Sequence, residues 1–528
     1  MSSGSAARTA VVTAAGTACA GVLVAVSPLI GLGLVLGVLA LVLAVRLDPK
    51  TLAVAGLLIC LMTKSLEIGT GLTAATFSDE IATAYLTVVL IGRRLWLRQP
   101  LRRPPGIWLF GVFTVFGVLS SVVSAVPLSI AAAGGILVVK GVLLYFALAQ
   151  IDWTTADIPW LARISAWVLG IALACAAVNL VLPVQWTAVL ANTGHPQYRS
   201  FLPSLIGPFT HPLLFGNFVA LAGIACAAPL LYWAQSRTGA KGARPLLAGA
   251  FLGAVLSFRR TAIVGMLAAL GFLALRRRSA SLLLTAVLVV PIAALLLYPV
   301  IREVYLATYT NFIVEGMDNA RTRMTVDSVT LALQHFPFGV GFGRFGSAIA
   351  RDNYSIEYLR LGYDNVYGLG SPNNPNNHGR FLTDTQWPAI VGETGLVGAL
   401  FFIGGLWKIF NTFRKAASAA PLPLRLLGVT GMGWMVHILL ESVAYPVFVT
   451  TPTSPMLFGL AAIAYVIWEG ASKERAAAET SGVPDDAVPD DAALDDGVPV
   501  GPRAADREAR FGSRPRVGAP SDAVPDRH

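Results

Sequence analysis

The chain has 528 residues, of which 55% are hydrophobic and only 13% are charged. A soluble protein carries roughly a quarter charged residues, so this composition excludes an ordinary water-soluble fold. The formal net charge is +10. Helical membrane proteins carry excess Lys and Arg on their cytoplasmic loops, which explains the charge without nucleic-acid binding.

Long apolar stretches recur from residue 10 to residue 469. Each is close to the ~20 residues that cross the hydrocarbon of a bilayer, so the sequence predicts an all-α, polytopic membrane protein with about fourteen transmembrane helices. The predicted spans are residues 11–27, 29–46, 51–65, 80–96, 106–124, 128–150, 160–183, 213–234, 245–258, 261–276, 280–301, 388–410, 425–447 and 452–469. The first stretch lacks a convincing cleavage site, and we expect it to be retained as a helix.

The sequence shows no sign of a cofactor or a resident metal. Four cysteines fall inside apolar stretches, where cysteine is typical as a small buried residue: Cys19, Cys60, Cys175 and Cys226. No P-loop, GxSxG run or Cys/His metal spacing occurs. We therefore expect no cofactor, no metal and no ATP-driven transport by this chain.

Basic clusters between the spans set the predicted orientation. They are Arg93, Arg94, Arg98, Arg102 and Arg103; Arg237, Lys241 and Arg244; Arg276, Arg277 and Arg278; and Arg414, Lys415 and Arg425. With the predicted helix count, all of them fall on one side, which the excess of positive charge identifies as the cytoplasm. Both termini are then cytoplasmic. The acidic, Pro-rich residues 470–528 are expected to form a disordered tail.

One large loop, residues 303–386, separates the spans before residue 302 from those in residues 387–469 and falls on the extracytoplasmic side. It is rich in aromatic residues, more than a linker needs. Apolar residues at helical spacing predict a helix over 321–336, which the Pro- and Gly-rich run that follows must end. Residues 364–380 look irregular. We expect a small, partly helical cap on the outer membrane surface.

Arg259 and Arg260 are the most distinctive charged residues, because they lie between two apolar spans on the predicted extracytoplasmic side. Ionisable groups so close to hydrocarbon are costly and usually functional. A guanidinium forms two parallel hydrogen bonds with phosphate oxygens, so the pair is a candidate phosphate site. Snorkelling to the interface, or pairing with a structural carboxylate, is the alternative explanation.

Other candidates lie in the outer loops. Arg321 and Arg323 open the helix predicted in the large loop and, taken alone, look like ordinary surface charges. Arg199 and His211 lie in a Pro- and Gly-containing loop just before a predicted span, where they offer polar contacts.

Three residues near the end of the large loop could take a proton from an acceptor hydroxyl: His378, Asp384 and Glu393. A hydrogen-bonded structural group near a helix start is the alternative explanation for Glu393. Three further ionisable residues lie within predicted spans, where they form buried pairs or line a pathway: Lys140, His437 and Glu441.

Four runs between about residues 195 and 410 carry a resemblance to a known superfamily. In chain order they are Gly207–Gly216 (GPFTHPLLFG), Ser257–Thr261 (SFRRT), Arg323 with Pro337–Phe345 (PFGVGFGRF), and Asp384–Trp387 (DTQW) with Glu393–Gly398 (ETGLVG). They resemble the GxxxH/NP element, the outer-face Ser-Arg element, the R…PxxGxGxxxF stretch and the HNxxL…ExGxxG stretch of the O-antigen ligases and Wzy-type polysaccharide polymerases. Asp384 stands where the ligases carry His, which favours a polymerase.

The resemblance implies a glycosyltransferase of the GT-C kind in a bacterial cytoplasmic membrane, acting in cell-surface polysaccharide biosynthesis. It would move a glycan from a polyprenyl pyrophosphate, such as undecaprenyl pyrophosphate, to an acceptor hydroxyl at the outer leaflet. Arginines can neutralise the departing pyrophosphate without a metal. Carried over by position, Arg259 or Arg260 would hold the pyrophosphate together with Arg323. The candidate pyrophosphate ligands are therefore Arg259, Arg260, Arg321 and Arg323, the further candidate substrate contacts are Arg199 and His211, and the candidate bases are Asp384, His378 and Glu393.

Two other classes of protein remain open. A transporter or flippase of lipid-linked glycans would place its ionisable residues along a path near the midplane, often between repeated halves, and no convincing repeat is present. A non-catalytic membrane scaffold would have no need of the outward arginines. The transferase hypothesis instead predicts charged residues gathered at the outer face, beneath the large loop.

Overall fold

The structure is a computed structural model that describes residues 46–191, 193–199, 202–232, 240–277 and 319–480, with the single residues 298, 302, 306 and 309. The predicted spans 11–27 and 280–301, and all but the last residue of 29–46, lie outside the residues described, apart from residue 298. So do most of residues 303–318 and the tail from residue 481 onwards. The full helix count therefore stays a prediction.

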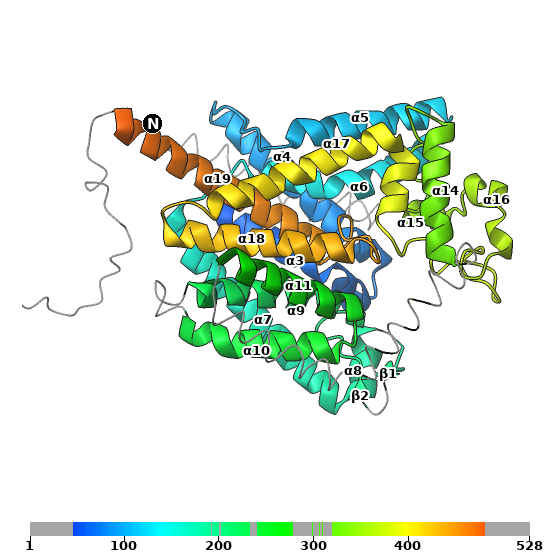
Figure 1. Ribbon diagram of the computed structural model, residues 1–528, viewed down its shortest axis with the longest axis horizontal. Helices are drawn as coiled ribbons and strands as arrows, with labels where there is room; N and C mark the ends of the chain where they lie inside the picture. The colour runs from blue at the N-terminus through cyan, green and yellow to red at the C-terminus, as the bar shows by residue number, and fades with distance from the viewer. Residues whose placement is uncertain are drawn as a thin grey trace, which may run out of the picture. The chain divides into compact units, whose positions relative to one another are not determined.

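Long α-helices dominate the described residues (Figure 1). They are α3 (Pro49–Thr70), α4 (Ser78–Trp96), α5 (Ile107–Val123), α6 (Leu128–Leu148), α7 (Ile158–Val181), α9 (Pro212–Leu231), α10 (Ala240–Leu256), α11 (Arg260–Arg277), α17 (Trp387–Ala416), α18 (Leu422–Glu441) and α19 (Thr453–Thr480). Each predicted span that falls within the described residues corresponds to one of these helices. By length and composition, 8 of the described helices can cross a membrane.

Shorter elements connect the long helices. Before α9 lie η1 (Thr73–Phe77), η2 (Thr155–Asp157), α8 (Pro183–Leu190) and the antiparallel strands β1 (Tyr198–Arg199) and β2 (Leu202–Pro203). Between α11 and α17 lie α14 (Ala320–Gln334), α15 (Ala348–Asp352), α16 (Ile356–Arg360) and η6 (Tyr363–Asn365). The helix predicted over 321–336 is thus α14, which Asn319 caps by accepting from the Arg321 and Thr322 amides.

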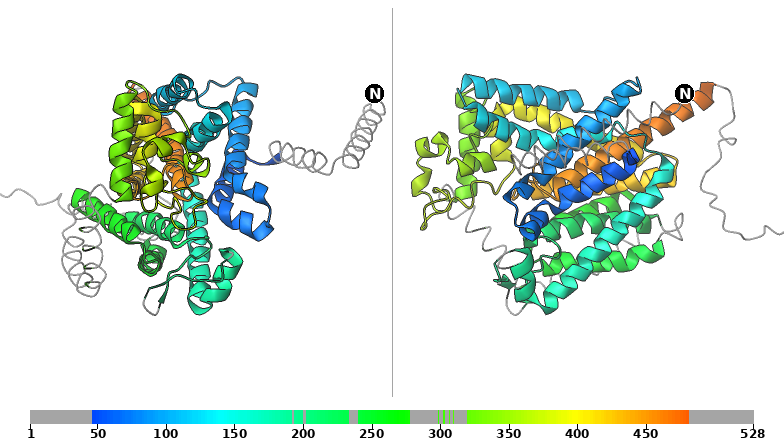
Figure 2. Two further views of the ribbon diagram at one scale, coloured as in Figure 1. Left: turned by 90° about the vertical axis from the view of Figure 1, so that its right-hand side faces the viewer. Right: turned by 180° about the vertical axis from the view of Figure 1, so that it is seen from behind.

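Most of the long helices lie side by side along roughly one axis in Figure 1, and the view from behind in Figure 2 shows the same arrangement. α9 packs against α10 and α11, α17 against α5 and α18, and α4 against α3 and α6. Small residues allow this close approach, as is typical of helices in membranes. A Cβ at Gly405 of α17, for example, would stand only 2.5 Å from the Phe110 ring of α5.

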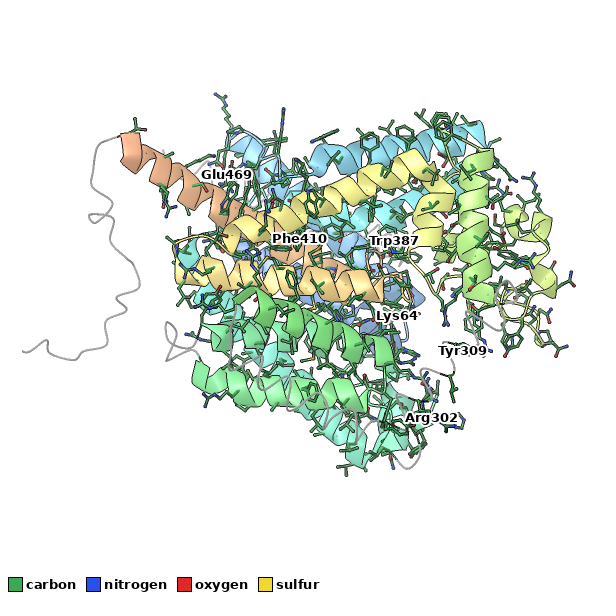
Figure 3. All side chains as sticks on the ribbon, viewed as in Figure 1. Lys64, Arg302, Tyr309, Trp387, Phe410 and Glu469 are labelled. Atoms are coloured by element: carbon green, nitrogen blue, oxygen red, sulfur yellow. The ribbon has the colours of Figure 1, made fainter. Side chains whose placement is uncertain are left out.

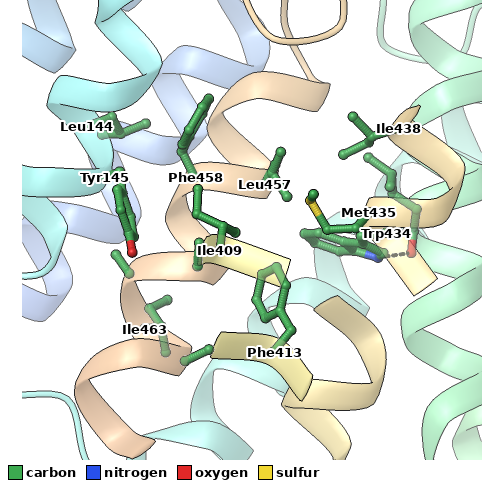
Figure 4. Close-up of a cluster of buried hydrophobic side chains, with 14 of the residues drawn as sticks. Leu144, Tyr145, Ile409, Phe413, Trp434, Met435, Ile438, Leu457, Phe458 and Ile463 are labelled. Carbon is green, nitrogen blue, oxygen red and sulfur yellow. Dashed lines mark hydrogen bonds between the residues drawn. The ribbon is translucent and has the colours of Figure 1, made fainter. Parts of the chain in front are cut away.

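One apolar core runs through the bundle. Figure 4 shows a part of it, where Tyr145 and Phe458 face Ile409 and Phe413 between α6, α19 and α17. The buried Trp434 of α18 also satisfies its polar atom, since its indole N–H donates to the Leu221 carbonyl at 2.7 Å.

Basic residues from separate helices meet at one end of the bundle. The Arg277 and Arg425 guanidinium groups lie 4.2 and 5.9 Å from the centroid of the Tyr232 ring. The Lys415 ammonium group lies 4.6 Å from the centroid of the Trp468 ring. These contacts join the ends of α9 and α11 to the start of α18, and the end of α17 to the middle of α19, near the basic clusters that the sequence assigns to one side.

Residues 319–386, here called the aromatic segment, have a separate core. Tyr358 and Tyr363 stack with their ring centroids 5.4 Å apart, and Phe345 packs against both. α14 runs across the direction of the long helices in Figure 1. The many aromatic residues of this segment are therefore used to build a core of its own.

The Gly-rich run after α14 is inserted among the long helices. Phe342 is 2% exposed, its ring lies against Gly117 of α5 and Gly135 of α6, and its amide donates to the Ser121 hydroxyl at 2.9 Å. α17 is kinked where this run passes, at Gly395, which has φ 75°. A Cβ at Gly395 would collide with the Phe338 carbonyl, so the kink requires glycine.

The predicted tail begins too early, because α19 continues past residue 469 to Thr480. Hydropathy falls at residue 469, but the Ala-, Lys- and Glu-rich residues that follow are good helix formers and extend the helix beyond its apolar part.

Candidate functional site

Three helix ends meet where the arginine pair lies. The Thr261 hydroxyl, in the first turn of α11, donates to the Glu441 carboxylate at the end of α18 at 2.9 Å. The backbone amide of Gln386, just before α17, donates to the Ser442 carbonyl oxygen at 3.1 Å. Trp387 donates to the Ser442 hydroxyl at 3.0 Å. In Figure 3, Trp387 lies at the end of the bundle nearest to α14, whereas Glu469 lies toward the opposite end.

A tight turn between α10 and α11 positions Arg259. Ser257 is 1% exposed, and its hydroxyl donates to the Ala254 carbonyl at 2.6 Å and accepts from the Arg259 amide at 3.3 Å. Phe258 takes a left-handed conformation with φ 52°. A residue other than Gly rarely adopts this conformation outside turns, so the backbone here is held by its surroundings. Arg260 follows as the half-buried first residue of α11.

Two polar side chains lie against the Arg259 guanidinium. Its Nη2 donates to Gln197 Oε1 at 3.3 Å and lies 3.2 Å from His211 Nε2. His211 Nδ1 accepts from the Leu213 amide at 3.3 Å, at the start of α9. A neutral imidazole with an accepting Nδ1 carries its proton on Nε2. Arg259 and His211 are then both donors, so their 3.2 Å contact is not a hydrogen bond, and an anionic acceptor between them would satisfy both groups.

The electrostatic surroundings of Arg259 include groups from three other segments. Burial and Arg199 lower the pKa of Arg259, while the Glu441 and Asp384 carboxylates act in the opposite direction. An arginine pKa is so high that the group stays charged. Partial removal from water and the charge of Arg259 lower the pKa of His211 to about 4, so His211 is neutral at pH 7. Arg199 itself is exposed on β1.

Asp384 is paired with Arg321. Its carboxylate accepts from Arg321 Nη2 at 2.6 Å, and the two side chains are 29% and 33% exposed. The guanidinium carbon of Arg321 also lies 5.0 Å from the centroid of the Phe381 ring. A cation on an aromatic face and a carboxylate together fix the orientation of Arg321. This ion pair therefore links the start of α14 to the chain just before α17.

Arg323 has different surroundings. Its guanidinium donates to the Leu361 carbonyl at 3.2 Å and lies 3.6 Å from the Asp327 carboxylate, which also accepts from the Tyr363 hydroxyl at 2.9 Å. These are contacts within the aromatic segment. They favour a structural role for Arg323 over the pyrophosphate contact that the resemblance implies.

The two other candidate bases lie apart from the arginines. Glu393 is 1% exposed, and its Oε1 accepts from the Ser347 hydroxyl at 2.6 Å and the Phe345 amide at 3.2 Å. It therefore holds the Gly-rich run against α17, which is the structural alternative. His378 is exposed and contacts the Asn374 carbonyl at 2.9 Å. Of these three described residues, only Asp384 contacts Arg321, and its charge also acts on Arg259.

Sequence reasoning missed Gln197 and did not place Glu441 beside Arg259. Gln197 contacts Arg259 but lies in a short irregular stretch with no pattern around it. Glu441 was noticeable only as a charge in an apolar run, and its proximity to Arg259 depends on how α11 and α18 pack.

Within the described part of the chain, no three His, Cys, Asp or Glu residues are grouped closely enough to hold a metal ion. No family model and no curated protein matches this chain.

Proposed function

We propose that this protein is a membrane glycosyltransferase that moves a glycan from a polyprenyl-pyrophosphate carrier to an acceptor hydroxyl. It acts at the extracytoplasmic face of a bacterial cytoplasmic membrane, without a metal or cofactor, as an O-antigen ligase-like or polymerase protein. The supports are the order of the motif-like runs and the arrangement of charges at one end of the bundle.

One observation carries the proposal: the Arg259 guanidinium and His211 Nε2 lie 3.2 Å apart at the starts of α11 and α9. Helix N-termini favour anions, because their first N–H groups have no partner within the helix and the helix dipole is positive there. Two side-chain donors at two helix N-termini make this the described place best suited to a pyrophosphate. Arg260 adds a second positive charge.

The reaction forms a bond between the acceptor oxygen and the anomeric carbon of the glycan. The bond from that carbon to the pyrophosphate oxygen breaks, and its electron pair leaves with the lipid pyrophosphate. The acceptor hydroxyl loses a proton to a base. Positive groups beside the departing pyrophosphate stabilise the charge that develops there, which is the role we assign to Arg259 and Arg260.

We assign the base to Asp384. In the ion pair with Arg321, one oxygen of this carboxylate is occupied by the guanidinium. A bound pyrophosphate would compete for Arg321 and release the carboxylate at the moment the donor is in place. The pair would thereby couple the base to donor binding.

The same arrangement supports the proposed orientation. The basic ends of α11 and α17 lie opposite the end that holds Arg259, and an excess of Lys and Arg favours the cytoplasmic side for them and the extracytoplasmic side for Arg259. The aromatic segment, whose last residue Gln386 donates to the Ser442 carbonyl at this end, is then the described part of the proposed extracytoplasmic cap.

The test is transfer by the full chain in liposomes, with a polyprenyl-pyrophosphate oligosaccharide as donor and an oligosaccharide as acceptor. Arg259→Ala and Arg260→Ala should each lower kcat/KM by about 10- to 100-fold, since a hydrogen bond to a charged group contributes about 1.5–3 kcal/mol. Arg360→Ala is the matched control, because this side chain is 64% exposed and pairs only with Glu357. Unchanged transfer by both folded variants would remove the proposed site.

The products of the same assay separate polymerase from ligase. Repeated chain lengthening supports a polymerase, and a single transfer to a different acceptor supports a ligase.

A transporter of lipid-linked glycans is the second candidate. A buried cluster of Asp79, Glu80 and Lys140 within helices of membrane length favours it, because such charges are typical of transport pathways. A transporter would move labelled donor between leaflets of the liposome and form no new glycosidic bond.

A further inference from the structure

Three charged side chains meet inside the bundle, away from the candidate site. The Lys140 ammonium group of α6 lies 2.5 Å from the Asp79 carboxylate and 2.6 Å from the Glu80 carboxylate, both in the first turn of α4. The three side chains are 11%, 9% and 24% exposed. All belong to helices that can cross a membrane.

The charges in this cluster do not cancel. One ammonium and two carboxylates sum to −1 when all are ionised. The two carboxyl groups also contact each other directly. Two carboxylates in contact repel strongly, and in a medium of low dielectric the uncancelled charge is costly. The usual solution is that such a pair shares one proton.

The hydrogen bonding of the cluster also favours one shared proton. Glu80 Oε1 accepts from Lys140, but Glu80 Oε2 is buried and has no partner among the described residues. An ionised carboxylate can only accept, so the contact between Asp79 and Glu80 contains two acceptors and no donor. A proton on either carboxyl group supplies the missing donor and converts repulsion into a hydrogen bond.

The described residues that line the space beside the cluster add no charge to those of Lys140, Asp79 and Glu80. A cavity of about 10 Å³ beside the cluster has space for roughly one water molecule. From α3 it is lined by the Cys60 thiol, from α4 by Thr83, and from the chain around the start of α19 by Thr450, Thr451 and Ser454. Lys140 and Asp79 are the only charged groups among these described lining residues, with Glu80 next to them.

Thr450, one of the residues that line the cavity, has a second polar neighbour. The Thr450 side chain lies against the Tyr445 hydroxyl, which is close enough to Glu441 and Asp384 to feel their charges.

We propose that Asp79, Glu80 and Lys140 form a binding site for one exchangeable proton, which the two carboxyl groups share beside the lysine ammonium. With that proton bound, the cluster is neutral. The ligand is a proton rather than a metal cation, because Lys140 already occupies the place between the carboxylates. This site is separate from the proposed glycosyl transfer and does not depend on it.

Infrared spectroscopy of the purified full chain in D₂O tests the site at neutral pH. The carbonyl band of a protonated carboxyl group should be present in the wild type. It should lose the intensity of one group in Glu80→Gln and in Asp79→Asn, because either change leaves one carboxylate to pair with Lys140. Glu393→Gln is the control for a buried carboxyl group elsewhere, and the cluster's band should survive it. A band that neither cluster substitution changes would overturn the proposal.

Thermal unfolding gives an independent measurement. Raising the pH removes the shared proton and leaves two adjacent carboxylates, so the unfolding temperature of the wild type should fall, by about 2 °C or more. Glu80→Gln should lack this fall, because its neutral amide keeps the cluster neutral. Parallel pH profiles for the two proteins would contradict the proposal. A second contradicting result would be an unfolding temperature that rises when NaCl is added but not when choline chloride is added. That result would assign the site to sodium.

Discussion

The Thr261 hydroxyl donates a 2.9 Å hydrogen bond to the fully buried carboxylate of Glu441. This bond ties the first turn of α11 to the last turn of α18, directly after the arginine pair. The direction in which Arg259 and Arg260 point therefore depends on a contact between helices that are far apart in the sequence.

Thr261→Val should destabilise the protein. Valine has the same shape but no donor, and it leaves the buried Glu441 Oε1 without its partner at a cost of about 1–3 kcal/mol. Thermal or denaturant unfolding in detergent measures the change. Thr330→Val is the control, since Thr330 is exposed on α14 and its hydroxyl bonds only its own helix, so a change below about 0.5 kcal/mol is expected. Equal effects of the two substitutions would contradict the assigned bond.

Gly395→Ala should also destabilise the protein. The residue has φ 75°, and the added methyl group would meet the Phe338 carbonyl, so a cost of at least about 1–3 kcal/mol is expected. Gly111→Ala is the control, because Gly111 lies inside α5 and its added methyl group would meet nothing within 4 Å. Alanine is the better helix former there, so this change should be neutral or stabilising by up to about 1 kcal/mol.

Asp384→Asn tests the assignment of the base under the proposed function. Loss of a general base lowers the rate by about 10²–10⁴-fold, and kcat for glycosyl transfer should fall by that amount. His378→Ala is the matched comparison, since this exposed histidine contacts only the Asn374 carbonyl and should leave kcat near the wild-type value. The opposite ranking of the two variants would transfer the role to His378.

Arg323→Gln should affect stability rather than donor binding. The ion pair with Asp327 is partly exposed, so its loss should cost about 1 kcal/mol or less, and KM for the donor should stay unchanged. Steady-state kinetics and unfolding of the same preparation separate the two effects. A KM increase of about tenfold or more at unchanged stability would restore the pyrophosphate contact that the resemblance implies.

The long helices were predictable because crossing hydrocarbon requires apolar runs that composition reveals directly. The residues at which these helices begin and end were less predictable. The predicted span 425–447 corresponds to α18, which begins at Leu422 and already ends at Glu441. The hydroxyl- and Pro-containing residues that follow, up to α19, are apolar enough to resemble helix but form turns. Hydropathy reports the depth at which residues lie, not the hydrogen bonds that end a helix.

The candidate site was predictable in its individual residues and not in its pairings. Arg259 and His211 were both noticeable, one as an unusual charge and the other in a structured loop, yet their 3.2 Å contact joins residues 48 positions apart. In the sequence, Arg321 and Arg323 looked equivalent. The fold pairs Arg321 with Asp384 and Arg323 with Asp327. Partner choice among charges follows from tertiary packing, which local patterns do not encode.

The insertion of Phe342 between α5 and α6 limits how a large, lipid-linked substrate could reach the arginines. Withdrawing a buried aromatic ring would leave a void that costs about 3–5 kcal/mol. The Gly-rich run around Phe342 should therefore stay in place between α5 and α6 when a substrate binds. Any opening would have to come from the parts of the aromatic segment beyond it, where the partly exposed Arg321–Asp384 ion pair joins the start of α14 to the chain just before α17.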